Sequence, residues 1–354
     1  MIDYKKELSE LIMTVIKEGG SDLHIAAGRH PTIRVLGSLI PLVKKPVLSP
    51  EDTQCLVFAM MSEENKKILL EKKEVDFSYS FEEKVRFRVN AFFQRGFIGA
   101  AMRLIPVEIK DFKALNLPDI LVDFCNKEQG FFLVVGPIGH GKSTTLAAMI
   151  DYINRNRSEH ILTIEDPIEY LFPQDKSIID QREVRIDTDN FYTALRSMFR
   201  QDVNVSMIGE MRDTETMSAA VTAAETGHLI LSSLHTNSAS QTIDRIIDSF
   251  TPEQQNQIRL QLSSALLGVF SQRLIPKISG GLVPAYELLI SVPAVRNLIR
   301  ENRSHEIDMV IETSYELGMV SLNRSLAELV RQGEISMENA YSFSLNPNGL
   351  EGLI

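Results

Sequence analysis

The stretch Gly-Pro-Ile-Gly-His-Gly-Lys-Ser, at positions 136–143, decides how the rest of the chain is interpreted. It fits the pattern G-x-x-x-x-G-K-[ST], whose glycines let backbone N–H groups approach a chain of phosphates. An apolar, β-prone run precedes it at 131–135, and a helical pattern follows at 144–150. The pattern is specific in this strand–loop–helix context, because the helix N-terminus favours negative charge. The stretch therefore predicts binding of a nucleoside triphosphate.

The positions of this loop have separate expected tasks. Lys142 would reach the β- and γ-phosphates, and the hydroxyl of Ser143 would ligate Mg²⁺. The glycines would bring backbone N–H groups close to the phosphate oxygens. The nucleotide-binding residues predicted from the pattern are Gly136, Pro137, Ile138, Gly139, His140, Gly141, Lys142, Ser143 and Thr144.

Length and composition describe an ordinary globular chain. With 354 residues, 44% of them hydrophobic, we expect two domains. The apolar runs are strand-sized, so no membrane-spanning segment is predicted. Cys55 and Cys125 are far apart, which suits a reducing cytoplasm and excludes a metal knuckle. The net charge of −10 disfavours a broad nucleic-acid surface. We therefore expect a cytoplasmic protein whose partner is not a nucleic acid.

Two segments with different patterns follow each other along the chain. Residues 1–105 read as helix, hairpin, helix and antiparallel meander, which predicts a small α+β domain whose sheet has one polar, arginine-bearing face. A linker is expected at 106–118. Residues 119–354 alternate strands and helices like a parallel sheet with crossover helices, and are helical from about 293 onward. The predicted fold class is α/β, with a smaller α+β domain in front.

Two acidic clusters stand at the ends of two predicted strands. Strand 161–165 runs into Glu165 and Asp166, and the strand that ends at Ile208 runs into Glu210. Ligands of open α/β sheets bind at the carboxyl ends of the strands, so we expect these acids beside the phosphate loop. Hydrolysis needs a group that orients water and ligands for Mg²⁺. Glu165 and Glu210 are therefore catalytic candidates, and Glu210 is also a candidate Mg²⁺ ligand, directly or through water.

His228 and His235 flank a strand predicted between them. They are seven positions apart, an odd number, so in a regular strand their side chains would point to opposite faces. This argues against one shared metal site. On the residues alone, each is best interpreted as a hydrogen-bonded structural histidine.

Five motifs in a fixed order resemble those of the secretion ATPases, and among them the type IV pilus retraction ATPases of the PilT/PilU type. The likeness extends over nearly the whole chain. The motifs are GPIGHGKSTT at 136–145, TIEDPIEY at 163–170, IGEMRD at 208–213, TAAETGHLILSSLHTNSA at 222–239 and AVRNLIRE at 294–301. No tetracysteine zinc motif is present, which separates the chain from the pilus-assembly and type II secretion ATPases.

This resemblance implies a RecA-like ATPase domain behind a PAS-like N-terminal domain, and a homohexamer that hydrolyses Mg-ATP to retract a type IV pilus. It implies a cytoplasmic protein, peripheral at the inner-membrane base of the pilus. The implied partners are the inner-membrane platform protein, the pilus machinery and a paralogous retraction ATPase. It assigns Glu165, Asp166 and Glu169 to the aspartate box, Gly209 and Glu210 to Walker B, and His228 and His235 to the histidine box. His228 is then the implied γ-phosphate sensor. The arginines implied to reach a neighbour's nucleotide come from Arg86, Arg88, Arg95 and Arg103.

Three departures from the family pattern leave alternatives open. His140 stands where the family usually has Ser, and could touch phosphate or simply be tolerated. The Walker B strand begins Val203-Asn204 and carries Ser206 in an apolar run. These changes motivate an accessory, PilU-like ATP-binding subunit as the alternative to a principal motor. A nucleic-acid translocase is disfavoured by the acidic charge, and a GTPase by the lack of an N-K-x-D segment after the loop.

Overall fold

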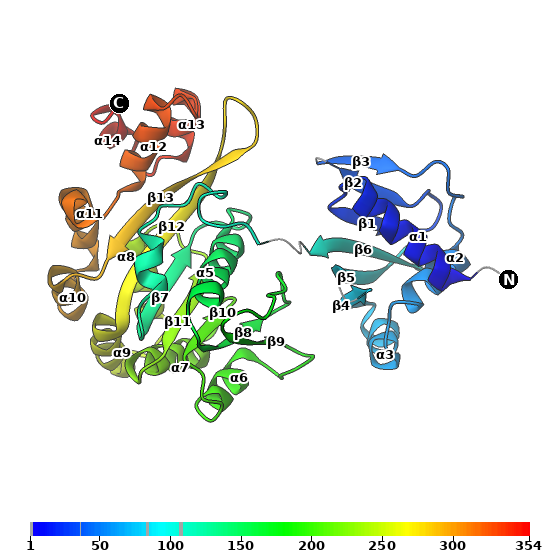
Figure 1. Ribbon diagram of the computed structural model, residues 1–354, viewed down its shortest axis with the longest axis horizontal. Coiled ribbons are helices and arrows are strands. Elements are labelled where there is room, and N and C mark those ends of the chain that lie inside the picture. Colours follow the sequence, from blue (N-terminus) through cyan, green and yellow to red (C-terminus); the bar gives the residue numbers. More distant parts are fainter. Residues whose placement is uncertain (1–2, 36, 83–84, 106–108) are drawn as a thin grey trace. The chain divides into compact units, whose positions relative to one another are not determined.

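The computed structural model describes residues 3–35, 37–82, 85–105 and 109–354. The chain divides into two compact units, Met1–Glu108 with Glu169–Leu171, and Ile109–Ile168 with Phe172–Ile354. Each unit has its own sheet and its own hydrophobic core (Figure 1). Of the linker predicted at 106–118, positions 106–108 lie outside the described residues. The rest groups with the second unit, where Phe112 is buried against Tyr152.

The first unit is an antiparallel sheet with helices on one face. Its strands lie in the order β3-β2-β1-β6-β5-β4. Their bounds are β1 Asp22–Ile25, β2 Thr32–Val35, β3 Ser38–Pro41, β4 Glu74–Phe81, β5 Val85–Gln94 and β6 Phe97–Ile105. The helices are α1 Tyr4–Lys17, α2 Pro50–Phe58 and α3 Glu63–Lys72. Phe87 and Val89 of β5 are fully buried under these helices, whereas Arg88 between them is exposed. The expected α+β layer with one polar, arginine-bearing face is confirmed.

The second unit is built on a seven-stranded sheet in the order β13-β12-β7-β11-β10-β8-β9. Only the pair β12–β13 is antiparallel. The bounds are β7 Gly130–Val135, β8 His160–Glu165, β9 Ile178–Glu183, β10 Val205–Ile208, β11 Leu229–Leu234, β12 Leu266–Pro276 and β13 Leu282–Ile290. Strands β7, β10 and β11 are buried along their whole length, which is typical of parallel strands covered on both faces. The predicted α/β class is therefore confirmed.

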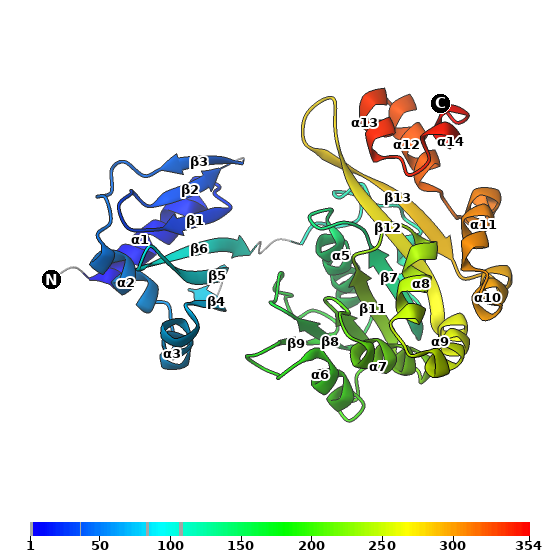
Figure 2. The ribbon, with the colours of Figure 1, turned by 180° about the vertical axis from the view of Figure 1, so that it is seen from behind.

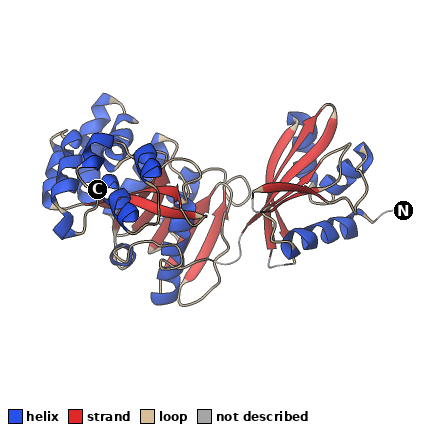
Figure 3. Cartoon of the chain, turned by 90° about the horizontal axis from the view of Figure 1, so that it is seen from above, coloured by secondary structure: helices blue, strands red, loops and turns tan. Residues whose placement is uncertain are grey.

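Helices surround this sheet, and Figure 3 draws helices in blue and strands in red. They are α4 Leu121–Cys125, α5 Lys142–Asn156, α6 Phe191–Met198, α7 Thr214–Glu225, α8 Ala239–Asp248 and α9 Pro252–Ala265. After β13 come α10 Pro293–Arg300, η1 Ser304–Glu306, α11 Ile307–Thr313, η2 Tyr315–Leu317, α12 Leu322–Arg331, α13 Met337–Phe343 and α14 Pro347–Glu351. Helices α12–α14 form a small core with β12 and β13 (Figure 2). Among the described helices, none combines the length and apolarity needed to cross a bilayer.

Candidate active site

The phosphate loop joins β7 to α5, as the sequence predicts. Gly136, Gly139 and Gly141 have φ values of 145°, 80° and 81°, in the region that side chains with a Cβ rarely adopt. At Gly136 space is limiting as well, because a Cβ there would lie 2.3 Å from the carbonyl oxygen of Gln272. The loop can therefore present its backbone N–H groups only with glycine at this position.

Four parallel strands bring the predicted residues to one edge of the sheet. In the register of the sheet Val135 lies opposite Leu234, Ser232 opposite Ile208, and Ile208 opposite Ile164. The residues after these positions therefore meet at the carboxyl edge. These residues are the phosphate loop, His235, Glu210 and Glu165.

Lys142 is the buried cation of this edge, with 7% of its surface exposed. Its Nζ donates to the carbonyl oxygens of Gly136 and Pro137, each at 2.9 Å, and lies 3.0 Å from Nδ1 of His235. An ammonium group can only donate, so Nδ1 is the acceptor in this contact and the ring proton is assigned to Nε2. That Nε2 lies 3.2 Å from Oε1 of Glu210. His235 thus connects Lys142 to Glu210.

The second carboxylate oxygen of Glu210, Oε2, contacts an arginine. Nε and Nη2 of Arg212 each lie 2.8 Å from Oε2 of Glu210. Nη1 of Arg212 is 4.0 Å from Oδ2 of Asp166, and Nη2 of Arg185 donates to the same oxygen at 3.3 Å. Positive and negative groups therefore alternate across the edge. Sequence reasoning missed both arginines. Arg212 could have been found from its place two residues after Glu210, but Arg185 follows β9, a strand the sequence did not reveal.

Glu165 is the last residue of β8, and it is 5% exposed. Its Oε1 accepts hydrogen bonds from Oγ1 of Thr163 at 2.8 Å and from Nε2 of Gln181 at 3.3 Å. It lies beside the Walker B turn, since a Cβ on Gly209 would be 3.5 Å from Cα of Glu165. Glu169 follows Glu165 in the sequence, but the segment Glu169–Leu171 groups with the first unit.

The structure places His228 far from the phosphate loop of its own chain, which disfavours its assignment as the γ-phosphate sensor. His228 precedes β11, and its carbonyl oxygen accepts from the N–H of Gly130 at the beginning of β7. A strand of six residues therefore separates it from the loop, roughly 20 Å away. Its Nδ1 lies 3.1 Å from the carbonyl oxygen of Ala223, and its ring meets Phe199 edge-on at 5.4 Å. His228 therefore lies at the amino edge of the sheet, where its described contacts are with Ala223, Phe199 and Gly130.

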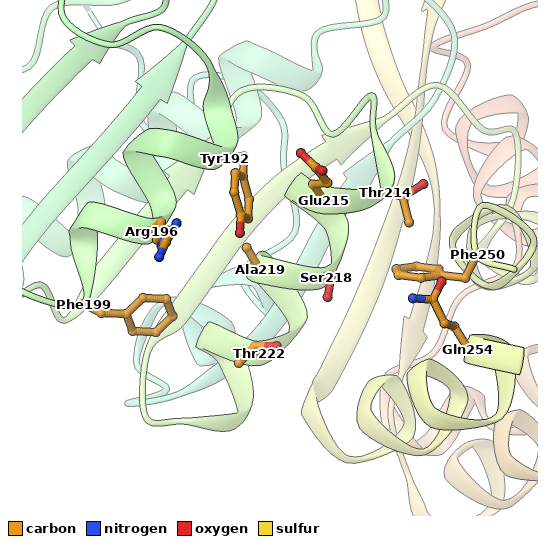
Figure 4. A pocket seen from close by; sticks show the side chains of 10 residues that line it. All are labelled: Tyr192, Arg196, Phe199, Thr214, Glu215, Ser218, Ala219, Thr222, Phe250 and Gln254. Atoms are coloured by element: carbon orange, nitrogen blue, oxygen red, sulfur yellow. The ribbon is translucent and has the colours of Figure 1, made fainter.

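A surface cavity of about 380 Å³ lies between α6, α7 and the beginning of α9. Figure 4 shows Tyr192 and Arg196 of α6 on one side and Glu215 of α7 on another, with Phe199 at the end of α6. None of the residues lining it is a predicted site residue. The cavity is therefore separate from the candidate active site.

The predicted arginines of the first unit fall into two groups. Arg34, Asp22, Arg103, Arg88 and Ser78 lie opposite one another in a row across the sheet. Nε of Arg103 donates to Asp22 at 3.0 Å. Burial disfavours the charge of Asp22, but hydrogen bonds from Ser21 and Arg103 bring its pKa below the usual value.

Arg86 lies two residues before Arg88 on the same strand and face. Arg95 instead occupies the turn after β5, with φ 52°, at the far end of that strand. The structure thus groups Arg86, Arg88 and Arg103 and separates Arg95 from them.

The donor set at the carboxyl edge suits Mg²⁺ carried with a nucleotide. Among the described residues no three His, Cys, Asp or Glu side chains gather into a metal site made by the protein alone. Mg²⁺ ordinarily takes one or two protein ligands beside phosphate oxygens and water. The hydroxyl of Ser143, in the first turn of α5, and the carboxylate of Glu210 fit that requirement.

Comparison with known proteins identifies the family. The model of the family described as type II/IV secretion system protein matches residues 4–283, well over half of the chain. The chain belongs to this family. The resemblance drawn from the five motifs is thereby confirmed.

Two curated members of the family match almost the full chain. The type IV pilus retraction ATPase PilT of Pseudomonas aeruginosa is 45% identical over 94% of this chain and 97% of its own. The type IV pilus ATPase PilU of the same organism is 41% identical over 98% of this chain and 91% of its own. A crystal structure of the pilus retraction motor PilT with bound ADP superposes with a TM-score of 0.92 at 49% identity, covering 97% of this chain and 98% of that one. The ATPase DotB of Legionella pneumophila superposes with a TM-score of 0.85 at 25% identity, over 98% and 96%.

Proposed function

We propose that this protein is a motor ATPase that hydrolyses Mg-ATP to drive retraction of a type IV pilus. The observation that carries the proposal is the connection from Lys142 through His235 to Glu210, built on four neighbouring strand ends. Such a connection joins the phosphate-binding cation to a carboxylate that can act on water. The similarity to a retraction ATPase extends over nearly the full chain, and it supports retraction of the pilus as the action of the motor.

The residues of the carboxyl edge divide the chemistry among them. The loop N–H groups and Lys142 hold the phosphates, and Ser143, with Glu210 through water, holds Mg²⁺. Mg²⁺, when bound, neutralises phosphate charge. Glu210 orients the attacking water, because His235 connects it to Lys142 at the phosphate loop. His235 takes the place of His228 as the γ-phosphate sensor.

The positive charge that completes the reaction centre comes from a neighbouring subunit of a homohexamer. Arg88 and Arg103 are both exposed, but Arg103 is held by Asp22, so Arg88 is our first candidate. Hydrolysis would shift the N-terminal domain (1–105) against the ATPase domain (119–354), with which the predicted linker groups from Ile109 onward. We place the ring in the cytoplasm at the inner-membrane base of the pilus, against the platform protein.

A PilU-like accessory role is the second candidate. It is favoured by His140 and Ser206, two departures in the nucleotide motifs, and by the similarity to PilU. The test expresses this protein in a strain lacking every retraction ATPase, and measures pilus retraction together with the ATP turnover of the purified chain. A principal motor restores retraction by itself. An accessory subunit restores it only when a second retraction ATPase is present, and absence of retraction in both strains contradicts the proposal.

A further inference from the structure

His140 is the loop residue whose contacts the proposed function does not account for. Its Nδ1 accepts a hydrogen bond of 2.9 Å from the backbone N–H of Leu274 in β12. Its carbonyl oxygen accepts from Nε2 of Gln272, also in β12, at 2.9 Å. The half-buried ring stands edge-on to Phe343 of α13, with 6.3 Å between the centroids. Both the backbone and the side chain of His140 are therefore tied to the neighbouring strand.

Gln272 extends this attachment to the two ends of the loop. Its Oε1 accepts from Oγ1 of Thr145, in the first turn of α5, at 2.6 Å. Its backbone carbonyl oxygen packs against Gly136 so closely that a Cβ there would come within 2.3 Å. A Cβ on Gly141 would lie 2.8 Å from its Nε2. The loop thus rests on Gln272 at its ends and on Leu274, through His140, at its tip.

We propose that His140 is a positioning residue whose neutral imidazole fastens the tip of the phosphate loop to β12 and so holds the loop in its nucleotide-binding shape. The proposal rests on the nucleotide site proposed above. A loop that leaves this shape part of the time binds nucleotide more weakly, in proportion to the fraction lost. Removing the acceptor also leaves the N–H of Leu274 without its partner, which disfavours the attached shape.

This attachment requires one protonation state. Because Nδ1 accepts from an amide N–H, the ring proton must be on Nε2, and a proton on Nδ1 would set two N–H groups against each other. The charged groups that bear on the ring are Arg273 of β12 and Lys142 of α5, while α13 contributes the uncharged Phe343. Burial, and then these two cations, lower the pKa of His140 from its ordinary value of 6.5. The attachment is therefore intact at neutral pH and is lost as the pH falls through the lowered pKa.

The sign of the pH effect separates this role from direct contact with phosphate. An imidazolium that touched phosphate would bind nucleotide more tightly on acidification, since its positive charge would be the useful form. A positioning imidazole does the opposite. His140→Asn is the matched variant, because its Oδ1 can occupy the place of Nδ1 as an acceptor and does not titrate.

The experiment titrates the full-length protein with a fluorescent N-methylanthraniloyl analogue of ADP at constant Mg²⁺. Wild type, His140→Asn, His140→Ala and Lys142→Ala are compared between about pH 7.5 and about pH 5.5, across the histidine range. We expect His140→Ala to bind about tenfold more weakly at the upper pH, and Asn to restore most of this loss. On acidification wild type should weaken relative to His140→Asn. Protonation of the nucleotide itself affects both proteins and cancels in their ratio.

Two results would overturn the proposal: equal affinity of wild type and His140→Ala, or a wild-type affinity that rises relative to His140→Asn on acidification. If His140→Ala does not melt cooperatively, the ratio of wild type to His140→Asn decides alone. Undiminished binding by Lys142→Ala would instead show that the nucleotide site itself is wrong, so the two failures are distinct.

Discussion

At the scale of the residue, the site depends on hydrogen-bonding groups that alternate as donor and acceptor. Lys142, His235 and Glu210 are joined by contacts of 3.0 and 3.2 Å, so each fixes the protonation or orientation of the next. A γ-phosphate that draws Lys142 toward it must change the partner of His235. This is the physical basis on which we assign phosphate sensing to that histidine.

The two histidines of the histidine box give a matched pair. We expect His235→Ala to lower the ATP turnover number by at least about a hundredfold, the size of effect found when one positioned transition-state group is removed. His228→Ala should keep turnover within about twofold and lower the free energy of unfolding by ~1 kcal/mol, through the lost contact with Ala223. Steady-state ATPase assays and denaturant melts measure the two effects. A large loss of turnover in His228→Ala with unchanged stability would contradict the assignment.

The sequence could identify the loop, Glu165 and Glu210, because a phosphate-loop glycine pattern seldom occurs by chance together with acids at two strand ends. Strand parity alone could not choose between the two histidines, because it tells which face of the sheet a side chain points to and not at which end of the strand the residue lies. The rule that placed Glu210 at the carboxyl edge applies equally to His235, which directly follows β11. The position of Arg185 could not be predicted from the sequence, because it depends on β9, a strand that the hydrophobic pattern does not indicate.

At the scale of the element, the pattern of hydrophobic residues predicts the buried strands of the sheet. It does not predict the strands that carry several polar residues. β7 and β8 stand out as apolar runs. β9 carries Asp180, Gln181 and Arg182, and it forms as an edge strand because β8 offers it a partner. β12 does not stand out as one apolar run, because polar residues interrupt it where it contacts the phosphate loop. In both strands, pairing with a neighbouring strand outweighs the low β-propensity of the polar residues.

Ser206 and Ser232 form a second matched pair, on the neighbouring strands β10 and β11. Both are fully buried, but the hydroxyl of Ser206 has no hydrogen-bond partner among the described residues, whereas that of Ser232 donates to the carbonyl oxygen of Ile208 at 2.8 Å. Ser206→Ala removes a buried group without a partner, so we expect the free energy of unfolding to rise by ~1 kcal/mol. Ser232→Ala should lower it by ~1 kcal/mol. Urea unfolding measures both, and shifts of the same sign in the two variants would refute this interpretation.

At the scale of the whole molecule, the proposed reaction needs two chains. The phosphate loop belongs to the second unit, and the arginine row with Arg88 and Arg103 belongs to the first. In a ring, each site would combine Lys142 of one subunit with an arginine of its neighbour. The sequence supports this arrangement only through the family resemblance. No pattern within one chain specifies which residues a second copy contributes.

Mixing two inactive variants tests this sharing. Arg88→Ala and Lys142→Ala should each be inactive alone, but in an equal mixture about one quarter of the interfaces combine an intact Lys142 with an intact Arg88. We therefore expect activity to return in the mixed ring. Mixing Lys142→Ala with Glu210→Gln is the control, because both residues serve the same chain's site and no interface becomes complete. Recovery in the control, or none in the first mixture, would contradict shared sites.

The most direct measurement is the Mg²⁺-dependent ATPase rate of the purified full-length protein beside that of Lys142→Ala. The matched control is Lys176→Ala, which removes an exposed lysine from the same unit. We predict that Lys142→Ala lowers the rate by at least about a hundredfold while Lys176→Ala retains it, since Lys142 is the lysine that we propose to bind the phosphates. Undiminished hydrolysis by Lys142→Ala would contradict the account.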